Sequence, residues 1–117
     1  MINFDSNVEA RLLSMLSLAR KAGKLATGEE GCEKAISKRE AKLILVATDA
    51  SQNTKKKFTN KANHYKVPLY SLFTKEVMGK HIGVHSRATI VVTDSGFAAK
   101  ILEFIKKGWV DAQKTCS

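Results

Sequence analysis

The sequence is poor in the features that divide a chain into domains or carry it across a membrane. It has one proline and no Gly- or Ser-rich stretch, so nothing indicates a linker. The longest apolar runs, 43–47 and 90–92, are too short to span a bilayer. The N-terminal residues lack the basic start and apolar stretch of a signal peptide. We therefore expect one cytoplasmic domain over 1–117, with a core at about 6–107, a short mobile C-terminal tail and no membrane partner.

Cysteines and enzyme motifs are scarce as well. Cys32 and Cys116 share no spacing typical of a metal site or a redox pair, and without an export signal both are expected to be reduced thiols. No phosphate loop ending in Lys-Ser or Lys-Thr is present, and 28–31 does not match a dinucleotide fingerprint. Asp49 and Asp94 each follow a predicted strand, where carboxylates ordinarily cap helices or form turns. The three histidines, His64, His81 and His85, lack metal-ligand spacing. We expect no catalytic residue, no metal, no cofactor and no enzyme activity.

Acidic residues are few relative to basic ones. Twenty Lys and Arg stand against eleven Asp and Glu, which gives a net charge of +9 and a pI near 9.7. A field of that sign attracts polyanions. No basic amphipathic helix with large aromatics on its apolar face is present, so nucleic acid is favoured over membrane.

Hydrophobic spacing along the chain alternates between helical and strand-like patterns. Helices are predicted from the capping box at 6–9 to Gly23, after Gly28, after Ser51, at 75–78 and at 96–107. Extended segments are predicted around Leu25 and at 43–48, 67–72 and 88–93. Helices that connect buried strands cover both faces of a sheet, which predicts an α/β fold of the three-layer α/β/α sandwich type.

Three segments suggest contact with RNA. The first is the turn from Thr27 and Gly28 into a helix that starts with Glu29 and Glu30, because the free amides of a helix start attract phosphate or polarised base edges. These acids also suit the helix dipole, so an ordinary helix start explains them too. A carboxylate near RNA would accept hydrogen bonds from base edges, and Lys34 could reach phosphate or a guanine edge. A helix start that reads base edges implies a kinked or bulged RNA, since the deep groove of regular duplex is inaccessible.

The other two segments are less specific. The stretch 79–88 is a basic, glycine-punctuated loop that suits phosphate contact, although ordinary connectors look the same. The run Lys55, Lys56 and Lys57 is ordinarily a solvated helix start. On the same edge of the molecule it would extend a phosphate track.

Taken together, a series of short segments resembles bacterial YlxQ proteins, small relatives of the ribosomal L7Ae and L30e superfamily, which is known for binding kink-turn RNA. The resemblance covers roughly residues 8–106 in order and without large gaps. No single motif is decisive, but the ordered set is specific. Its segments are 18–24, 27–30, 41–45, 49–51, 53–56, 65–68, 78–80 and 93–98.

The resemblance implies a four-stranded mixed sheet, with RNA across the second helix start and the loop before the last strand. In kink-turn binders the helix start reads Gly-x-Asn-Glu-x-x-Lys, and its Asn and Glu meet tandem sheared G·A pairs. Gly28 and Lys34 keep that spacing, whereas Glu30 stands at the Asn position and Gly31 at the Glu position. The RNA-binding residues implied by the turn, the loop and the family are Lys24, Thr27, Gly28, Glu29, Glu30, Gly31, Lys34, Val84, Ser86 and Arg87.

We therefore predict a non-enzymatic RNA-binding protein, associated with the ribosome or with translation, that recognises a bent or kink-turn-like structured RNA. The altered motif does not specify a standard kink-turn. Two alternatives stay open: a protein-interaction module, and a substrate-binding partner of an RNA-modifying enzyme. The sequence gives no reliable sign of the oligomeric state, and a monomer is favoured.

Overall fold

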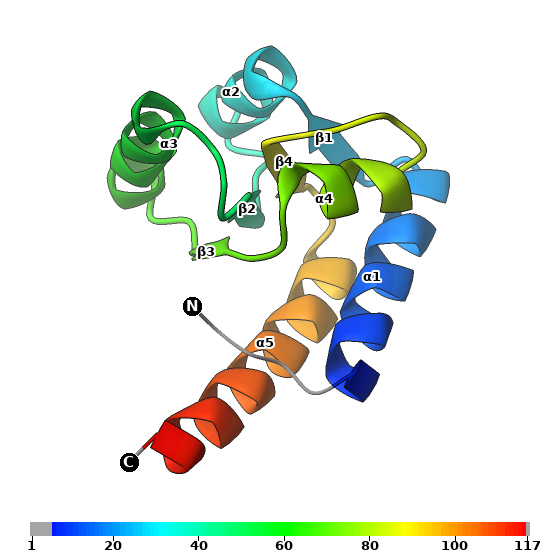
Figure 1. Ribbon diagram of the computed structural model, residues 1–117. Helices are drawn as coiled ribbons and strands as arrows, with labels where there is room; N and C mark the ends of the chain where they lie inside the picture. Colours follow the sequence, from blue (N-terminus) through cyan, green and yellow to red (C-terminus); the bar gives the residue numbers. More distant parts are fainter. Residues whose placement is uncertain (1–5, 117) are drawn as a thin grey trace.

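Five helices and four strands alternate in the computed structural model, which describes the backbone of residues 6–116 and the side chains of residues 7–107 (Figure 1). The predicted order of elements is confirmed. The elements are α1 (Ser6–Lys21), β1 (Leu25–Thr27), α2 (Glu29–Ser37), β2 (Leu43–Val46), α3 (Gln52–Tyr65), β3 (Leu69–Ser71), α4 (Lys75–His81), β4 (Thr89–Val92) and α5 (Ser95–Cys116).

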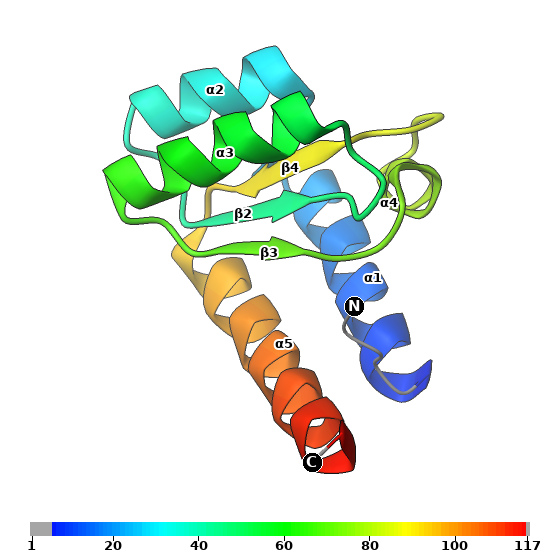
Figure 2. The ribbon, with the colours of Figure 1, turned by 60° about the vertical axis from the view of Figure 1, so that its left-hand side comes forward.

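The strands form one mixed sheet in the order β1-β4-β2-β3. β4 runs antiparallel to both β1 and β2, and β2 is parallel to β3. Figure 2 shows α2 and α3 on one face of the sheet and α1 and α5 on the other, with α4 at one end of the strands. The α/β/α sandwich with a four-stranded mixed sheet is therefore confirmed.

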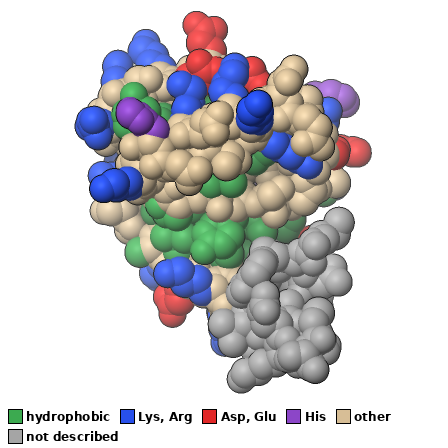
Figure 3. Space-filling model, turned by 90° about the vertical axis from the view of Figure 1, so that its left-hand side faces the viewer, with side chains coloured by type: hydrophobic (Ala, Val, Ile, Leu, Met, Phe, Trp, Pro, Cys, Tyr) green, Lys and Arg blue, Asp and Glu red, His purple; other side chains and the backbone are tan. Residues whose placement is uncertain are grey.

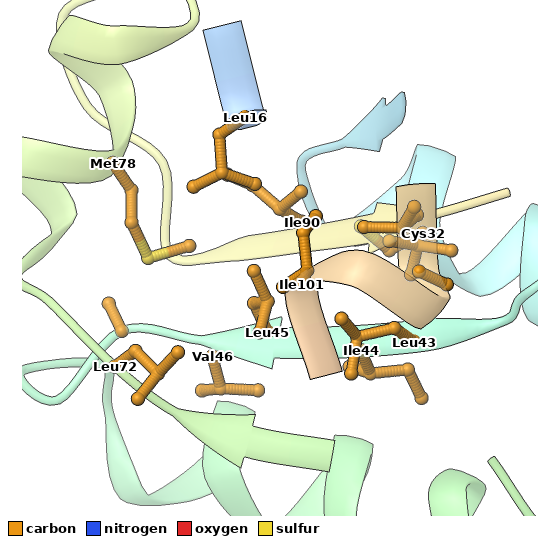
Figure 4. Close-up of a cluster of buried hydrophobic side chains, with 14 of the residues drawn as sticks. Leu16, Cys32, Leu43, Ile44, Leu45, Val46, Leu72, Met78, Ile90 and Ile101 are labelled. Atoms are coloured by element: carbon orange, nitrogen blue, oxygen red, sulfur yellow. The ribbon is translucent and has the colours of Figure 1, made fainter. Parts of the chain in front are cut away.

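The two central strands supply the middle of the core. Every residue of β2 and β4 is buried, as expected for strands that helices cover on both faces. Leu45 of β2 pairs with Ile90 of β4, and in Figure 4 both belong to one cluster with Ile101 of α5 and Leu16 of α1. Burial of side chains of this size contributes about 1.5–3 kcal/mol each. This core fixes the helices against the sheet.

Capping residues set several of the helix ends. Gly23, with φ of 72°, ends the first helix: its amide bonds to the Arg20 carbonyl, and the Lys24 amide bonds to the Ala19 carbonyl. This pair of bonds is a Schellman motif, which requires the left-handed backbone that glycine adopts without strain. Ser51 accepts a hydrogen bond from the Thr54 amide at the start of α3, as predicted.

Two predicted helix ends were wrong. α5 continues to Cys116 rather than ending at Lys107, because a single glycine such as Gly108 costs a helix only about 1 kcal/mol relative to alanine and does not stop it. α4 continues to His81 rather than ending at Met78, and Ile82 after it is buried against the core. In the described part of the chain, no helix has the length and apolarity needed to cross a membrane.

One edge of the sheet gathers several loops and helix starts. β1, β2 and β3 all end at this edge, and β4 begins there. The starts of α2 and α3, α4 and the loop that leads into β4 lie at the same end of the strands (Figure 2). Segments more than fifty residues apart in the sequence therefore meet at one surface.

Candidate nucleic-acid interface

The turn between β1 and α2 is centred on Gly28. Its backbone has φ of 81° and ψ of 158°, a conformation that is essentially restricted to glycine. Gly28 donates its amide to the Thr89 carbonyl at 3.2 Å, and its own carbonyl accepts the first helical bond from Cys32 at 3.0 Å. No side chain caps this end of α2. Because the first amides of a helix have no partner within it, this start can receive hydrogen-bond acceptors from a ligand.

The loop before β4 lies against this turn. The Arg87 guanidinium donates through Nε to the Thr27 hydroxyl at 3.4 Å and through Nη1 to the Ser86 carbonyl at 2.9 Å. A methyl group added to Gly28 would lie 4.0 Å from Arg87 Nε. The two segments with the strongest predicted role in RNA contact are therefore brought together.

A close contact with α4 fixes the position of this loop. Gly79 is buried in α4, and a Cβ there would lie 2.4 Å from Ser86 Cα and 2.7 Å from Ser86 N. The Val84 amide bonds to the Gly79 carbonyl at 2.9 Å, and the Arg87 amide to the Lys75 carbonyl at 3.1 Å. α4 thus holds both halves of the loop through backbone contacts.

Glu29, the first residue of α2, faces α3. Its carboxylate accepts a hydrogen bond from the Thr54 hydroxyl and lies 3.5 Å from Lys57 Nζ. Lys57 also pairs with Glu33 at 2.8 Å, and the Ser51 hydroxyl donates to Thr54 at 3.0 Å. We call these five residues the α2–α3 network. It joins the start of one helix to the start of the next.

The hydrogen bond from Thr54 holds the pKa of Glu29 below its ordinary value of 4.5; burial opposes this lowering, and Lys57 supports it. The Glu33 carboxylate raises the pKa of Lys57 through its hydrogen bond. Both side chains therefore stay charged and paired with protein groups at neutral pH.

The remaining predicted residues lie at different distances from the turn. Glu30 and Lys34 are exposed on α2, and Gly31 is half-buried, with open space within 4 Å of the point where a side chain would begin. Val84 and Ser86 are half-buried in the loop. Lys24 precedes β1 and contacts Thr93, at the opposite edge of the sheet. Of the predicted residues, Thr27, Gly28, Ser86 and Arg87 are joined by contacts.

Basic side chains extend this surface along α3. Lys56 is exposed and Lys55 half-buried, at the helix start that shares the edge with the Gly28 turn. Figure 3 views the molecule from the side where α3 lies, and Lys and Arg side chains are spread over its upper part, with acidic side chains among them at the top. Lys57 differs from its neighbours because the α2–α3 network holds it.

The residues that were considered as candidates for catalysis, metal binding or redox chemistry have structural roles. Asp49 accepts the Lys75 amide at 2.9 Å, and Asp94 accepts the Phe97 amide at 2.8 Å, so both act as the predicted helix and turn caps. His81 Nδ1 lies 3.0 Å from the Val77 carbonyl within α4. Burial raises the pKa of the Cys32 thiol to about 11, so this buried thiol is protonated at neutral pH. Among the described residues, no group of three or more His, Cys, Asp and Glu is arranged to hold a metal ion.

Sequence reasoning missed the α2–α3 network and the role of Gly79. The sequence does contain a sign of the α2–α3 network, since Glu29 and Glu33 are four residues apart and share one helix face. A lysine or hydroxyl on a neighbouring helix was a reasonable partner for that face. Gly79 had no comparable signal, because only the folded chain shows which backbone approaches it.

The fold and the edge surface define a class of small α/β/α domains with a helix start and a basic loop at one end of the sheet. Residues 10–103 match the ribosomal protein L7Ae/L30e/S12e/Gadd45 family. The chain therefore belongs to this family, and its curated relatives place it with the YlxQ proteins.

Two curated relatives carry the description RNA-binding protein YlxQ. That of Bacillus subtilis (strain 168) is 43% identical over 91 residues, which is 78% of this chain and 91% of the relative. That of Enterococcus faecium is 41% identical over 96 residues, which is 82% of this chain and 92% of the relative.

Solved structures show the same fold. A protein of unknown function from Bacillus halodurans C has a TM-score of 0.80 at 37% identity, over 83% of this chain and 98% of that one. The Giardia lamblia 15.5kD RNA binding protein has a TM-score of 0.72 at 15% identity, over 88% of each chain. The second likeness shows that the fold persists where little sequence is shared.

Proposed function

We propose that this protein binds structured RNA through the edge surface formed by the Gly28 turn, the start of α2 and the loop that ends at Arg87. One observation carries the proposal. The structure joins Arg87 to Thr27 across sixty residues of sequence, in a family whose YlxQ relatives are described as RNA-binding proteins.

Each group has a distinct role at such an interface. The uncapped amides at the start of α2 bind a phosphate or an acceptor on a base edge. Arg87 and Lys34 place positive charge near the phosphates of the RNA backbone. Lys55 and Lys56 extend this positive surface along α3. Glu30 is exposed in the first turn of α2 and accepts from guanine imino and amino groups. Glu29, bound to Lys57 and to the Thr54 hydroxyl, positions the two helix starts instead.

The RNA target is bent or kink-turn-like. Side chains cannot read the deep major groove of regular A-form duplex, so a helix start needs splayed or unpaired bases. Gly31 has no side chain to accept from a sheared G·A pair, in contrast to the Glu of standard kink-turn readers. We therefore infer a preference for bulged RNA over both straight duplex and a standard kink-turn. The basic surface and the family suggest a ribosomal or translation-associated RNA, with the protein acting as a cytoplasmic monomer and without enzyme activity.

Fluorescence anisotropy on three labelled RNAs, a bulged hairpin, a standard kink-turn and a straight duplex, tests this proposal. Arg87→Ala and Lys34→Ala should each weaken binding to the bulged hairpin about tenfold, equivalent to about 1.4 kcal/mol. Lys38→Ala, at the C-terminal end of α2, is the matched control and should change affinity less than twofold.

A gain-of-function variant sharpens the test. Glu30→Asn combined with Gly31→Glu restores the kink-turn reader pattern and should raise affinity for the standard kink-turn at least tenfold. Equal binding of all three RNAs by the wild type, or no effect of Arg87→Ala and Lys34→Ala, would overturn the proposed site.

A further inference from the structure

A second feature lies in the other helical layer, away from the edge surface. α1 and α5 lie side by side (Figures 1 and 2), and an open groove of about 690 Å³ runs between them. Its lining is mainly apolar, with Met15 and Leu18 from α1 and Phe97 and Phe104 from α5. This groove is neither part of the RNA site proposed above nor explained by it.

The groove contains an exposed apolar side chain. Among the described residues, Leu18 is the large hydrophobic residue with substantial exposure, at 56%. It also lines a neighbouring hollow between α1 and α4, together with Leu13, Ser17 and His81. Leu18 therefore stands on a ridge between two hollows, where a partner that spans the ridge would bury it.

Two of the three charged side chains in the groove lining, Arg11 and Lys100, are basic. The Arg11 guanidinium lies over the Phe104 ring, 5.9 Å from its centroid, and Lys100 lines the groove beside it. Within residues 7–107 neither cation forms an ion pair. The acid in the lining, Asp94, already accepts the Phe97 amide. An apolar floor with two cations that pair with no acid among residues 7–107 is complementary to an apolar segment that carries negative charge.

We propose that the α1–α5 groove binds an acidic amphipathic helix from another protein. Its apolar residues, spaced at three and four, would cover Leu18, Phe97 and Phe104, in the manner of helix-in-groove recognition. Its carboxylates would pair with Arg11 and Lys100.

Other occupants fit the groove less well. A second copy of this chain would bring two Arg11–Lys100 pairs together, in a protein that already carries +9. A small molecule is ordinarily enclosed over most of its surface, whereas this groove is open to solvent along the helices. RNA bases stack on aromatic rings, but they gain no such contact from Met15 and Leu18, whereas an apolar helix face covers all four side chains. The groove and the edge surface belong to different helical layers, so both can be occupied at once.

Site-specific photocrosslinking in living cells of the source organism tests this proposal. A photoreactive amino acid replaces the exposed Ser14, which lines the groove, and in a matched control it replaces Ala99, exposed on α5 outside the lining. Mass spectrometry identifies the crosslinked segment. We expect a segment of another protein with apolar residues at helical spacing and net negative charge, captured from Ser14 and not from Ala99.

The identified segment, made as a synthetic peptide, allows a quantitative test. Leu18→Glu should weaken its binding at least tenfold and Ala99→Glu less than twofold, although both add the same charge. Arg11→Glu with Lys100→Glu should abolish the weakening that 300 mM salt causes relative to 50 mM salt.

RNA affinity of Leu18→Glu should equal that of the wild type, which shows that the variant is folded and separates this proposal from the RNA site. Crosslinks to this chain itself, to RNA or to a basic segment would overturn the proposal, as would equal capture from Ser14 and Ala99.

Discussion

Glu29 illustrates how the role of one residue depends on its neighbours across helices. Its position at a helix start suits contact with a base edge, but the Thr54 hydroxyl and Lys57 occupy its carboxylate. The Ser51 hydroxyl extends the chain of donors to the cap of α3. The residue therefore ties two helix starts at the candidate RNA-binding edge, one residue before the exposed carboxylate of Glu30.

Thr54→Val should raise the pKa of Glu29, because the hydroxyl donor is the main cause of its lowered value. Stability from a lowered carboxylate pKa is present above the ordinary value of 4.5 and is lost as pH falls through the lower, folded value. The variant should therefore lose less stability than the wild type as pH falls below 4.5. NMR titration of the Glu29 carboxyl carbon and urea unfolding at several pH values measure both effects.

Thr59→Val, at an exposed position of the same helix, is the control. It should leave the Glu29 titration unchanged. A Glu29 pKa that stays low in Thr54→Val would show that Lys57 or the helix dipole, and not the hydroxyl, holds the charge.

At the scale of elements, α4 supports the loop before β4. Its buried Gly79 lets the backbone at Ser86 approach closely, and carbonyl groups of α4 accept hydrogen bonds from the loop amides. Arg87 consequently reaches Thr27 from a loop whose position is fixed by its contacts with α4. The geometry of the candidate interface depends on a helix that contributes no side chain to it.

Gly79→Ala should displace this loop and weaken RNA binding without altering a residue that faces RNA. The added methyl group meets backbone atoms under 3 Å away, which cannot move as a flexible side chain would. Overpacking of this kind costs about 1–3 kcal/mol in unfolding free energy. Urea unfolding and anisotropy with the bulged hairpin measure the two losses, which should occur together.

The exposed Glu76→Ala in the same helix is the control, with a change within about 0.5 kcal/mol. If Gly79→Ala is destabilised but binds RNA as tightly as the wild type, the position of the loop does not determine RNA affinity and the prediction is wrong.

The elements themselves were predictable from the sequence because their signals are local. The capping Ser51, the terminating Gly23 and the buried runs at 43–46 and 89–92 depend on neighbours within a few residues. Strand order was not predictable, since it depends on which faces pack together. The end of α4 was also missed, because the sequence does not show that Gly79 lies inside the helix and packs against the backbone of Ser86. For the site, the turn and the loop were predicted individually, and their contact came from the structure.

At the scale of the whole molecule, the charge of +9 should govern RNA affinity. Each phosphate that a cation neutralises adds about 0.7–0.9 to the slope of log affinity against log salt concentration. Arg87→Ala should therefore reduce the slope by about one such increment, and Lys38→Ala should leave it unchanged. Titrations of the bulged hairpin between 50 and 300 mM salt give the slopes. A slope near zero in the wild type would mean that the excess charge serves another purpose.

The position of β4 has a consequence for how the protein is made. β4 is the last strand in the sequence, yet it lies between β1 and β2, and β1 pairs with no other strand. A growing chain cannot complete the sheet until residue 92 has left the ribosomal tunnel, because β1 can pair only with β4, which is synthesised later. The sheet is therefore expected to be completed only after β4 has been synthesised, and non-local pairing of this kind is slow relative to helix formation. Until β4 joins the sheet, α2 and α3 lack the complete sheet on which they pack. The edge surface is therefore expected to form last.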